Sequence, residues 1–232
     1  LALYPVVALV ARRRTGRRRA GGELPRILRG PVPIVSIHYA ARADRLRGRG
    51  GGGARVARVA MGADRAGDVA GRRILDAGCG AGIPISLMLS ERFKVTGVDF
   101  SEAQIELAKR NIPHARFLCE DMTQLDFPDS TFDGITSYYA IIHIPREEHQ
   151  ALLANFHRML KPGGLALLCL GAEHLIDDIE EDFYGARMYW SHYDRETYLG
   201  LLKELGFQVI WSRLVADESC EGAKHLFVLA QK

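Results

Sequence analysis

A glycine-rich segment carries the most specific chemistry in this sequence. It reads Asp76-Ala77-Gly78-Cys79-Gly80-Ala81-Gly82, so a carboxylate closes a strand-like run and three glycines follow at alternate positions. Glycine suits a turn in which the backbone takes a positive φ or lets a ligand lie against it. The helix expected from Ile83-Pro84 onward presents unpaired N–H groups to a carboxylate or a phosphate. The segment therefore predicts a binding site for a nucleotide-type ligand.

A second carboxylate stands at a distance that suits the ribose of such a ligand. Val98-Asp99 closes the next strand-like run, 21 residues after Gly78, where an acid can accept hydrogen bonds from both ribose hydroxyls. Either motif alone is also compatible with a tight turn or a capping acid, whereas the two together indicate a nucleotide site. The dinucleotide fingerprint needs glycine at position 83, where this chain has Ile83. The spacing therefore weakens the case for a nicotinamide cofactor.

The hydrophobic pattern from Arg72 onward predicts the elements that must position these residues. Short aliphatic runs alternate there with helical patterns, which is typical of a parallel sheet. The five expected parallel strands are 73–77, 94–100, 116–120, 134–138 and 165–170. Two last strands, 207–215 and 225–230, flank a polar loop too short for a crossover helix and are expected to pair antiparallel. The predicted fold is α/β, a Rossmann-like doubly wound seven-stranded sheet with five parallel strands plus a C-terminal antiparallel hairpin.

Cap residues predict where the helices between these strands begin. Ser101 and Gln104 form a capping box ahead of an apolar helical face. Pro145 opens a second helix, since proline suits the first helical turn, and Asp194 opens a third. Such an arrangement leaves the carboxyl ends of the strands as the edge where open α/β sheets bind ligands.

Four motifs, in their order along the chain, resemble those of class I S-adenosylmethionine-dependent methyltransferases of the small-molecule type. They are Asp76 to Gly82, Val98-Asp99-Phe100-Ser101, Glu120-Asp121-Met122 and Leu160-Lys161-Pro162-Gly163-Gly164. The resemblance runs from about residue 71 to the end of the chain and leaves residues 1–70 outside it. It implies a methyltransferase domain with S-adenosyl-L-methionine as the cofactor.

The resemblance also implies roles for individual residues. The expected cofactor contacts are Asp76, Gly78, Cys79 and Gly80 around the methionine part, Asp99 on the ribose, Phe100 against the adenine, and Asp121 and Met122 at the adenine edge. The place of Asp121 agrees with its role, because this acid follows the third strand and emerges at the same sheet edge as the other two. From the residue types alone, Asp121 is also compatible with an N-cap, and Phe100 with a core aromatic.

Residues after the fourth strand are candidates for proton transfer. Methyl transfer asks mainly for placement, because the sulfonium methyl is already activated and the attack is in line. Some acceptors also need a base, and an imidazole near neutrality suits that task. We therefore expect His143 and Tyr138 as catalytic residues and Tyr139 as a substrate-binding residue. The alternative for His143 is packing at the helix entry ahead of Pro145, and the tyrosines are also compatible with a lining role.

An insertion over residues 171–193 separates the fifth strand from the last helix. It holds an acidic run, 177–182, followed by a stretch rich in aromatic residues. Loops over this edge of the fold often carry the binding residues, so we expect a pocket lid in which Trp190 and His192 contact the acceptor. The alternative for the aromatic residues is a dimer contact, while the acidic run reads as a solvated face.

The first 70 residues differ so much from the rest that we expect a domain boundary between residues 70 and 71. This arm contains 15 Arg, no Lys and four acidic residues, whereas residues 71–232 contain 16 basic and 24 acidic side chains. An arginine- and glycine-rich segment buries too little apolar surface to fold alone, so the arm is expected to be largely disordered or loosely packed. The alternatives are a tail that binds nucleic acid and an organelle transit peptide.

Composition excludes several classes of protein. No apolar run approaches the roughly 20 residues of a membrane span. The cysteines form neither a disulfide framework nor a metal pair, and the histidines show no metal spacing, so no metal is expected; the cysteines are Cys79, Cys119, Cys169 and Cys220. The acidic domain has no basic face of its own, which argues against a nucleic-acid partner for it.

Together these observations predict a cytoplasmic enzyme that transfers a methyl group from S-adenosylmethionine to a small-molecule acceptor. The sequence leaves the identity of the acceptor and the oligomeric state open. One alternative function is a nicotinamide-dependent oxidoreductase. The other is a non-catalytic nucleotide-binding module whose basic arm contacts nucleic acid.

Overall fold

The computed structural model describes residues 71–183, 186–216 and 223–232. The arginine-rich arm over residues 1–70 lies outside this range, as do Tyr184 of the aromatic stretch and most of the polar loop before the last strand. The expectations for the arm, and for the domain boundary after residue 70, therefore stay predictions.

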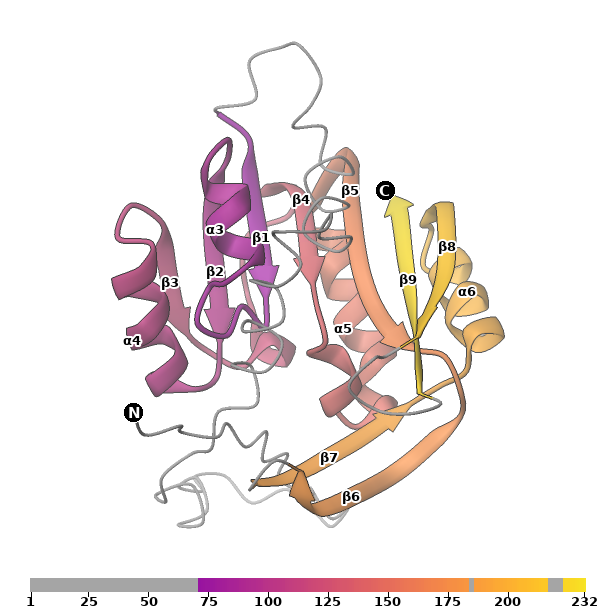
Figure 1. Ribbon diagram of the computed structural model, residues 1–232. Helices are drawn as coiled ribbons and strands as arrows, with labels where there is room; N and C mark the ends of the chain where they lie inside the picture. Colours follow the sequence, from indigo (N-terminus) through magenta and orange to yellow (C-terminus); the bar gives the residue numbers. More distant parts are fainter. Residues whose placement is uncertain (1–70, 184–185, 217–222) are drawn as a thin grey trace, which may run out of the picture.

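Strands alternate with helices along the described part of the chain (Figure 1). The strands are β1 (Arg73–Ala77), β2 (Lys94–Asp99), β3 (Arg116–Cys119), β4 (Phe132–Ser137), β5 (Leu160–Gly171), β6 (Leu175–Phe183), β7 (Ala186–His192), β8 (Gln208–Ala216) and β9 (Lys224–Gln231). The α-helices are α3 (Ile85–Ser90), α4 (Glu102–Asn111), α5 (Arg146–Met159) and α6 (Arg195–Glu204). Two 3₁₀ helices, η2 (Met122–Gln124) and η3 (Ile141–His143), follow β3 and β4.

Seven of these strands form one mixed sheet, in the order β3-β2-β1-β4-β5-β9-β8. Strands β1 to β5 run parallel, and β9 pairs antiparallel with both β5 and β8. The predicted Rossmann-like sheet with a C-terminal antiparallel hairpin is therefore confirmed. The strand order reverses beside β1, and such a switch point is where open α/β sheets bind ligands.

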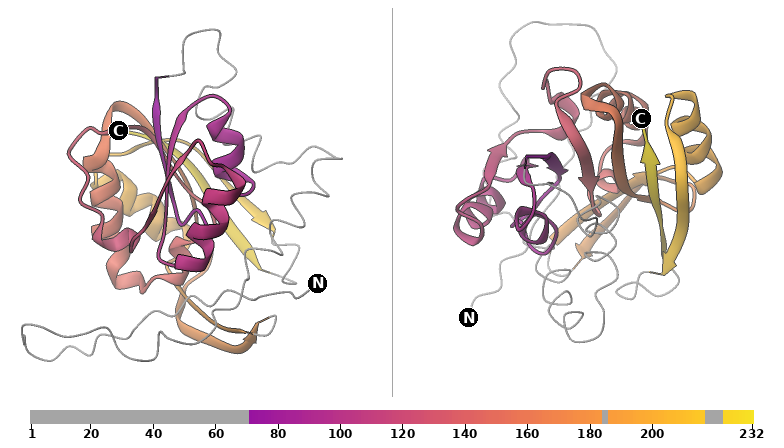
Figure 2. Two further views of the ribbon diagram at one scale, coloured as in Figure 1. Left: turned by 90° about the vertical axis from the view of Figure 1, so that its left-hand side faces the viewer. Right: turned by 90° about the horizontal axis from the view of Figure 1, so that it is seen from above.

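Helices cover both faces of the sheet (Figure 2). Side chains alternate between the two faces along each strand, so each layer of helices meets its own row of apolar residues. One face packs against α5 and α6 through Leu75, Val98, Leu152, Phe156 and Leu202. The other face packs against α3 and α4 through Ile74, Val95, Leu89, Ile105 and Ile112. Both cores fix the strands, and hence the positions of the residues that directly follow β1, β2 and β3.

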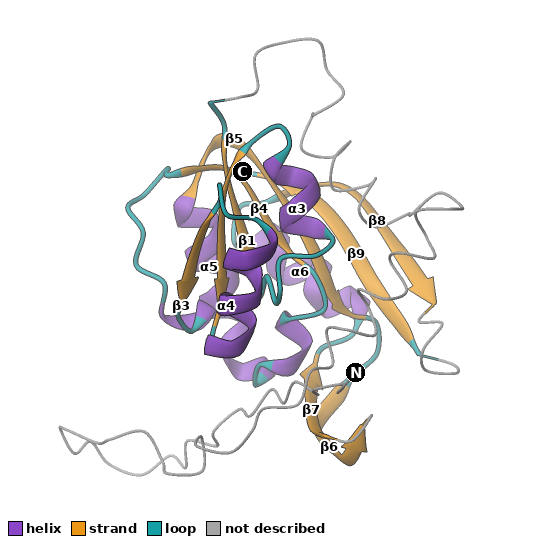
Figure 3. Ribbon diagram, turned by 60° about the vertical axis from the view of Figure 1, so that its left-hand side comes forward, coloured by secondary structure: helices purple, strands orange, loops and turns teal. Residues whose placement is uncertain are grey.

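Strands β6 and β7 form a separate hairpin beyond the end of β5 (Figures 1 and 3). Paired strands were not predicted here. The apolar residues Leu175, Ile179 and Phe183 recur every four positions, a spacing that fits one face of a strand as well as one face of a helix. The register shifts twice along β6, between Leu175 and Asp178 and between Glu180 and Phe183. The acidic residues between the apolar ones are exposed, as expected for a solvated face.

Two local details differ from the sequence prediction. Strand β5 begins at Leu160 rather than at residue 165, because Leu160 already pairs with Phe132 of β4 before the register shifts. The capping box at the start of α4 is half formed. Ser101 Oγ accepts a hydrogen bond from Gln104 N at 3.4 Å, whereas the buried Gln104 carboxamide does not return to the cap and has no partner among the described residues.

The other two predicted helix starts agree with the structure. Pro145 directly precedes α5. Asp194 caps α6, its Oδ1 accepting a hydrogen bond from Thr197 N at 2.8 Å. Within the described residues, no helix is long and apolar enough to cross a lipid bilayer.

Candidate functional site

Asp76 lies buried at the end of β1, between β4 and α3. Ser86 Oγ donates a hydrogen bond to its Oδ2 at 2.5 Å, and Thr136 Oγ1 donates to its Oδ1 at 3.0 Å. Burial raises the pKa of Asp76 to about 6, because two hydroxyl donors only partly replace the lost hydration of the carboxylate. A cationic group bound at this strand end would favour the ionised carboxylate.

The glycine turn that follows takes the conformation its sequence predicts. Gly78, Gly80 and Gly82 have φ values of 77°, 53° and 79°. A Cβ atom at Gly78 would lie 2.2 Å from Ala140 Cβ and 2.9 Å from Met122 Cε. Both the backbone angle and the packing therefore require glycine at this position.

Asp99, at the end of β2, holds the other side of the turn. Cys79 N donates to Val98 O at 2.9 Å. Gly80 N donates to Asp99 Oδ2, and Ser101 N donates to Asp99 Oδ1, both at 2.9 Å. Each carboxylate oxygen has a second lone pair, so Asp99 keeps acceptor capacity for two ligand hydroxyls. Burial raises the pKa of Asp99.

Two side chains close to Asp99 in sequence differ in exposure. The Gln104 side chain is 1% exposed, and neither polar atom of its amide has a partner among the described residues. Leaving a buried amide unpaired costs about 1–3 kcal/mol. Phe100 is 47% exposed. This exposure excludes the core-aromatic interpretation and leaves the ring available to a planar ligand.

Asp121 and Met122 follow β3 at the same edge of the sheet. Asp121 Oδ1 accepts hydrogen bonds from Thr123 N at 2.9 Å and from Thr123 Oγ1 at 2.8 Å, so the N-cap interpretation is realised in η2. No described residue bonds its Oδ2. Met122 Cε lies against Gly78 of the glycine turn. Both residues therefore border the turn.

The structure thus places the predicted cofactor residues together at the carboxyl ends of three adjacent strands. Ala77 of β1 pairs with Val98 of β2, and Asp99 pairs with Cys119 of β3. The resulting edge combines three carboxylates, a glycine turn and an exposed aromatic ring. We refer to it as the cofactor side. The arrangement suits a nucleoside that carries a cationic tail.

Tyr138 and Tyr139 leave β4 beside this edge and contact β9. The Tyr138 ring lies 5.5 Å from that of Phe227, and the Tyr139 ring meets His225 edge-on at 4.9 Å. Burial raises the pKa of the Tyr138 phenol well above its usual range, so this hydroxyl is a donor at neutral pH. Tyr139 has a φ of 50°, a left-handed conformation that costs a bulky residue energy and often occurs at functional sites.

His143 ends η3 and contacts the hairpin. Its Nδ1 lies 2.8 Å from Tyr189 O. Because a carbonyl only accepts, Nδ1 carries the proton and Nε2 carries the lone pair. Burial lowers the pKa of His143 to about 4. The imidazole is therefore neutral at physiological pH. Its hydrogen bond to Tyr189 O also agrees with the alternative that His143 has a packing role.

Further contacts hold the hairpin against the start of α5. Arg146 N donates to Ser191 Oγ at 3.3 Å, and the Arg146 guanidinium lies 5.2 Å from the centre of the Tyr193 ring. The Trp190 ring lies 5.8 Å from that of His143 and meets Phe183 edge-on. The hairpin thus contacts the element that carries His143, which agrees with a lid over this edge.

His192 and His225 meet at the end of β5. His192 Nδ1 lies 2.7 Å from Glu173 O, and a Cβ at Gly171 would lie 2.1 Å from this nitrogen. Gly171 is also the cross-strand partner of His225. The proximity of His192 and His225 lowers the pKa of His143 further, and the Tyr139 ring contacts His225. We refer to these four residues, Tyr139, His143, His192 and His225, as the acceptor side.

The sequence analysis missed His225 as a site residue, although a signal was present. An antiparallel last strand begins at the edge where the parallel strands end, so its first residues belong to that edge.

Among the described residues, no group of three or more His, Cys, Asp or Glu side chains could hold a metal ion.

Comparison with known proteins shows what this part of the chain is similar to. A family model described as "Methyltransferase domain" matches residues 74–164, which include the cofactor side. Phosphoethanolamine N-methyltransferase 3 of Arabidopsis thaliana is 31% identical over 152 residues, 60% of this chain and 29% of that protein. Demethylmenaquinone methyltransferase of Clavibacter sepedonicus is 34% identical over 106 residues, 44% of this chain and 42% of that protein. The chain spans less than half the length of either relative.

Solved structures share the fold at lower identity. A TehB-like SAM-dependent methyltransferase from Corynebacterium glutamicum superposes with a TM-score of 0.60 at 24% identity, covering 85% of this chain and 97% of that one. The Burkholderia thailandensis 1,6-didemethyltoxoflavin-N1-methyltransferase, solved with its substrate and S-adenosylhomocysteine, gives a TM-score of 0.57 at 22% identity, with coverages of 85% and 89%.

Proposed function

Because the chain carries a class I S-adenosylmethionine-dependent methyltransferase domain, we propose that it transfers the methyl group of S-adenosylmethionine to a small-molecule acceptor. The observation that carries the proposal is the cofactor side. There, Asp76, the glycine turn and Asp99 stand at the carboxyl ends of the adjacent strands β1 and β2.

The proposed binding mode assigns each group a task. Asp76, Gly78, Cys79 and Gly80 surround the methionine part. The Asp76 carboxylate there attracts a positive charge, because burial otherwise disfavours its ionised form. Asp99 accepts hydrogen bonds from the ribose hydroxyls. Phe100 stacks on the adenine, and Asp121 and Met122 read the adenine edge.

The chemistry asks little of the protein beyond placement. S-adenosylmethionine supplies a methyl group on a sulfonium, ready for in-line displacement. The acceptor side must align a nucleophile with that methyl group and exclude water. His143 Nε2 is our proposed proton acceptor, while Tyr138 keeps its proton and orients the acceptor as a donor. Tyr139, Trp190 and His192 are the proposed acceptor contacts.

The names of two relatives support a small acceptor. The two matched enzymes are named for phosphoethanolamine and demethylmenaquinone, and the described domain carries more acidic than basic side chains, which disfavours a nucleic-acid partner. Among the described residues, Cys79 and Cys119 are free thiols. Free thiols are typical of a reducing compartment, so we propose that the enzyme is cytoplasmic.

Asp99→Ala tests the proposed function. The variant loses hydrogen bonds to a charged acceptor, worth about 1.5–3 kcal/mol each, so titration calorimetry should show S-adenosylhomocysteine binding at least about tenfold weaker. Asp133→Ala is the matched control, because Asp133 accepts from Arg73 N and Lys161 Nζ at the opposite edge of the sheet. It should keep the parent affinity. Unchanged affinity in Asp99→Ala, or thermal stabilisation by NAD in place of S-adenosylhomocysteine, contradicts the assignment.

A further inference from the structure

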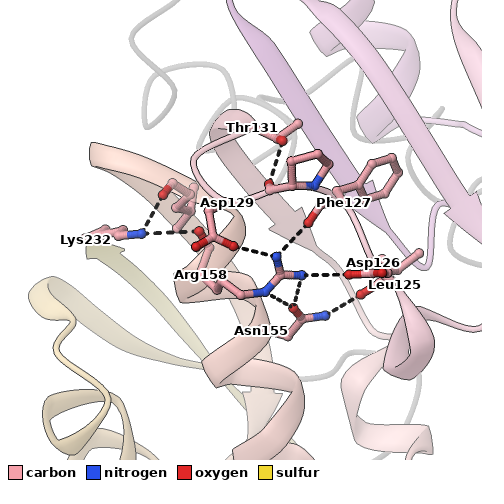
Figure 4. A network of polar contacts seen from close by, with 10 residues as sticks. Leu125, Asp126, Phe127, Asp129, Thr131, Asn155, Arg158 and Lys232 are labelled. Atoms are coloured by element: carbon pink, nitrogen blue, oxygen red, sulfur yellow. Dashed lines mark hydrogen bonds and ion pairs between the residues drawn. The ribbon is translucent and has the colours of Figure 1, made fainter.

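Arg158, near the end of α5, is the centre of a polar network on the loop that follows η2 (Figure 4). Its Nη1 donates to Phe127 O at 2.8 Å and to Asp129 Oδ1 at 2.7 Å. Its Nε and Nη2 donate to Asn155 Oδ1 at 3.0 and 2.8 Å. Asp126 adds an ion pair at 3.6 Å. The Arg158 side chain therefore contacts three residues of the loop, Asp126, Phe127 and Asp129.

Asn155 links this network to η2. Since Oδ1 accepts two hydrogen bonds from the guanidinium, the amide can point only one way, and Nδ2 donates to Leu125 O at 2.7 Å. Leu125 is the residue that directly ends η2, and its side chain is 3% exposed in the core. The orientation of a single amide thus fixes the backbone at the end of η2.

The helix η2 has little stability of its own. It comprises three residues, Met122–Gln124, and so short a 3₁₀ helix depends on partners at its ends. Asp121 caps the first end through bonds to Thr123, and Asn155 holds the last end. Met122 lies between the two and touches the glycine turn.

We propose that Arg158 and Asn155 are positioning residues, which set the place of η2 and thereby the reading of the adenine edge by Asp121 and Met122. The proposal rests on the proposed function, because it takes Asp121 to accept a hydrogen bond from the adenine amino group. Neither positioning residue belongs to the cofactor side, since their side chains bond each other, the loop and the end of η2. Their effect reaches the cofactor side through the backbone of Leu125.

A purely stabilising role for the network predicts a different result, and Lys232 separates the two. Lys232 Nζ donates to Arg158 O at 3.3 Å and to Leu160 O at 2.8 Å. It supports the same end of α5 without a contact to η2. Lys232→Met is therefore a control that weakens the fold here and leaves the position of η2 alone.

The test compares S-adenosylhomocysteine with S-inosylhomocysteine, in which a carbonyl oxygen replaces the adenine amino group. That oxygen would face the Asp121 carboxylate, so the parent should prefer the adenine compound by about tenfold or more. Asn155→Asp keeps an acceptor for Arg158 but sets an oxygen against Leu125 O. We expect it to melt near the parent temperature, to lose the preference to within about twofold, and to raise KM for S-adenosylmethionine more than it lowers kcat.

Arg158→Lys provides a second variant, since an ammonium cannot bridge Asn155 and the loop at once; it should lose the preference in the same way. Lys232→Met should keep it despite a lower melting temperature. If Asn155→Asp and Arg158→Lys both retain the parent preference, the positioning role is overturned and the cofactor site stands. If the parent itself binds both compounds equally, the assignment of Asp121 to the adenine edge fails, and the positioning role fails with it.

Discussion

The cofactor side and the acceptor side of the carboxyl edge are assembled in different ways. Asp76, Asp99 and Asp121 each stand within two residues of the end of β1, β2 or β3, so short local segments deliver them. The acceptor side joins η3, β7 and β9, and its members His143 and His225 are distant in sequence. The first depends on where three strands end, and the second on how a hairpin and a last strand dock.

The two sides also respond differently to burial. Burial raises the pKa of Asp76 to about 6, whereas it lowers the pKa of His143 to about 4. His149, beside the acceptor side in α5, behaves like His143. Its Nε2 donates to Ile144 O at 2.9 Å, its Nδ1 accepts from Tyr198 Oη at 2.7 Å, and burial lowers its pKa to about 4. Acidification therefore removes the cost of burying an ionised Asp76, whereas it adds a cost for keeping the buried His143 and His149 neutral.

The largest effect is expected from Gly78→Ala, which adds a methyl group where the glycine turn packs against Ala140, the residue after Tyr139. The added Cβ would lie 2.2 Å from Ala140 Cβ, on a backbone with a φ of 77°. Strain and overpacking together should cost about 3 kcal/mol or more and abolish S-adenosylhomocysteine binding. Denaturant unfolding and calorimetry measure both losses.

Gly200→Ala is the matched control for that substitution. Gly200 lies in α6, and a Cβ there would meet nothing within 4 Å. Replacing a helical glycine should stabilise the domain by about 0.5–1 kcal/mol without an effect on cofactor binding. If Gly78→Ala is as stable as the parent and binds the cofactor, position 78 does not require glycine.

The next largest effect concerns the pH dependence of stability. A buried histidine whose folded pKa is lowered supports the fold above an unfolded pKa of about 6.5 and loses that support as the pH falls toward 4. For His149 the loss is about 3 kcal/mol. The free energy of unfolding of His149→Gln should therefore fall less steeply than that of the parent between pH 6.5 and 4.5.

Asp76→Asn should change the slope in the opposite direction. An acid whose folded pKa is raised from 3.8 to about 6 binds a proton more tightly when folded, so it gains stability as the pH falls through this window. Without that gain, the variant should lose stability more steeply on acidification than the parent. Parallel slopes for the parent and both variants would remove the electrostatic contrast between the two sides.

The same difference between the two sides explains which parts of the structure could be predicted from the sequence. The alternation of apolar runs predicted the strands of the sheet to within a few residues, because each run meets a core on at least one face. It located Asp76 and Asp99 because both acids stand at the carboxyl end of a predicted strand, Asp76 one residue before the end of β1 and Asp99 as the last residue of β2. The hairpin was not predicted, because the spacing of Leu175 and Ile179 fits a strand face and a helix face equally, and the two strands pair through a shifted register.

His225 escaped for a related reason, since its place depends on the docking of β9 beside β5. The half-formed capping box shows a further limit. Sequence spacing brought Gln104 to the start of α4, but spacing cannot tell whether a side chain returns to its cap or turns inward. Local patterns therefore predict groups delivered by one strand end, whereas groups that meet through tertiary contacts need the structure.

The last prediction separates the two roles of His143. As the proposed proton acceptor, this residue contributes about 10² to turnover, at the low end for a general base, because burial lowers its pKa to about 4 and makes it a weak base. The pH–rate profile of the parent should accordingly be flat near neutrality and rise only through acidic pH. His143→Ala should reduce kcat roughly a hundredfold.

His143→Asn is the control that decides between catalysis and packing. Its amide nitrogen can take the place of Nδ1 and donate to Tyr189 O, the bond that holds the hairpin, but it has no basic nitrogen. A catalytic His143 therefore predicts the same loss of kcat in His143→Asn as in His143→Ala, with KM for the acceptor near the parent value in the asparagine variant. Recovery of kcat by asparagine would leave His143 as the anchor of the hairpin, and the acceptor side would then act through Tyr139, His192 and His225.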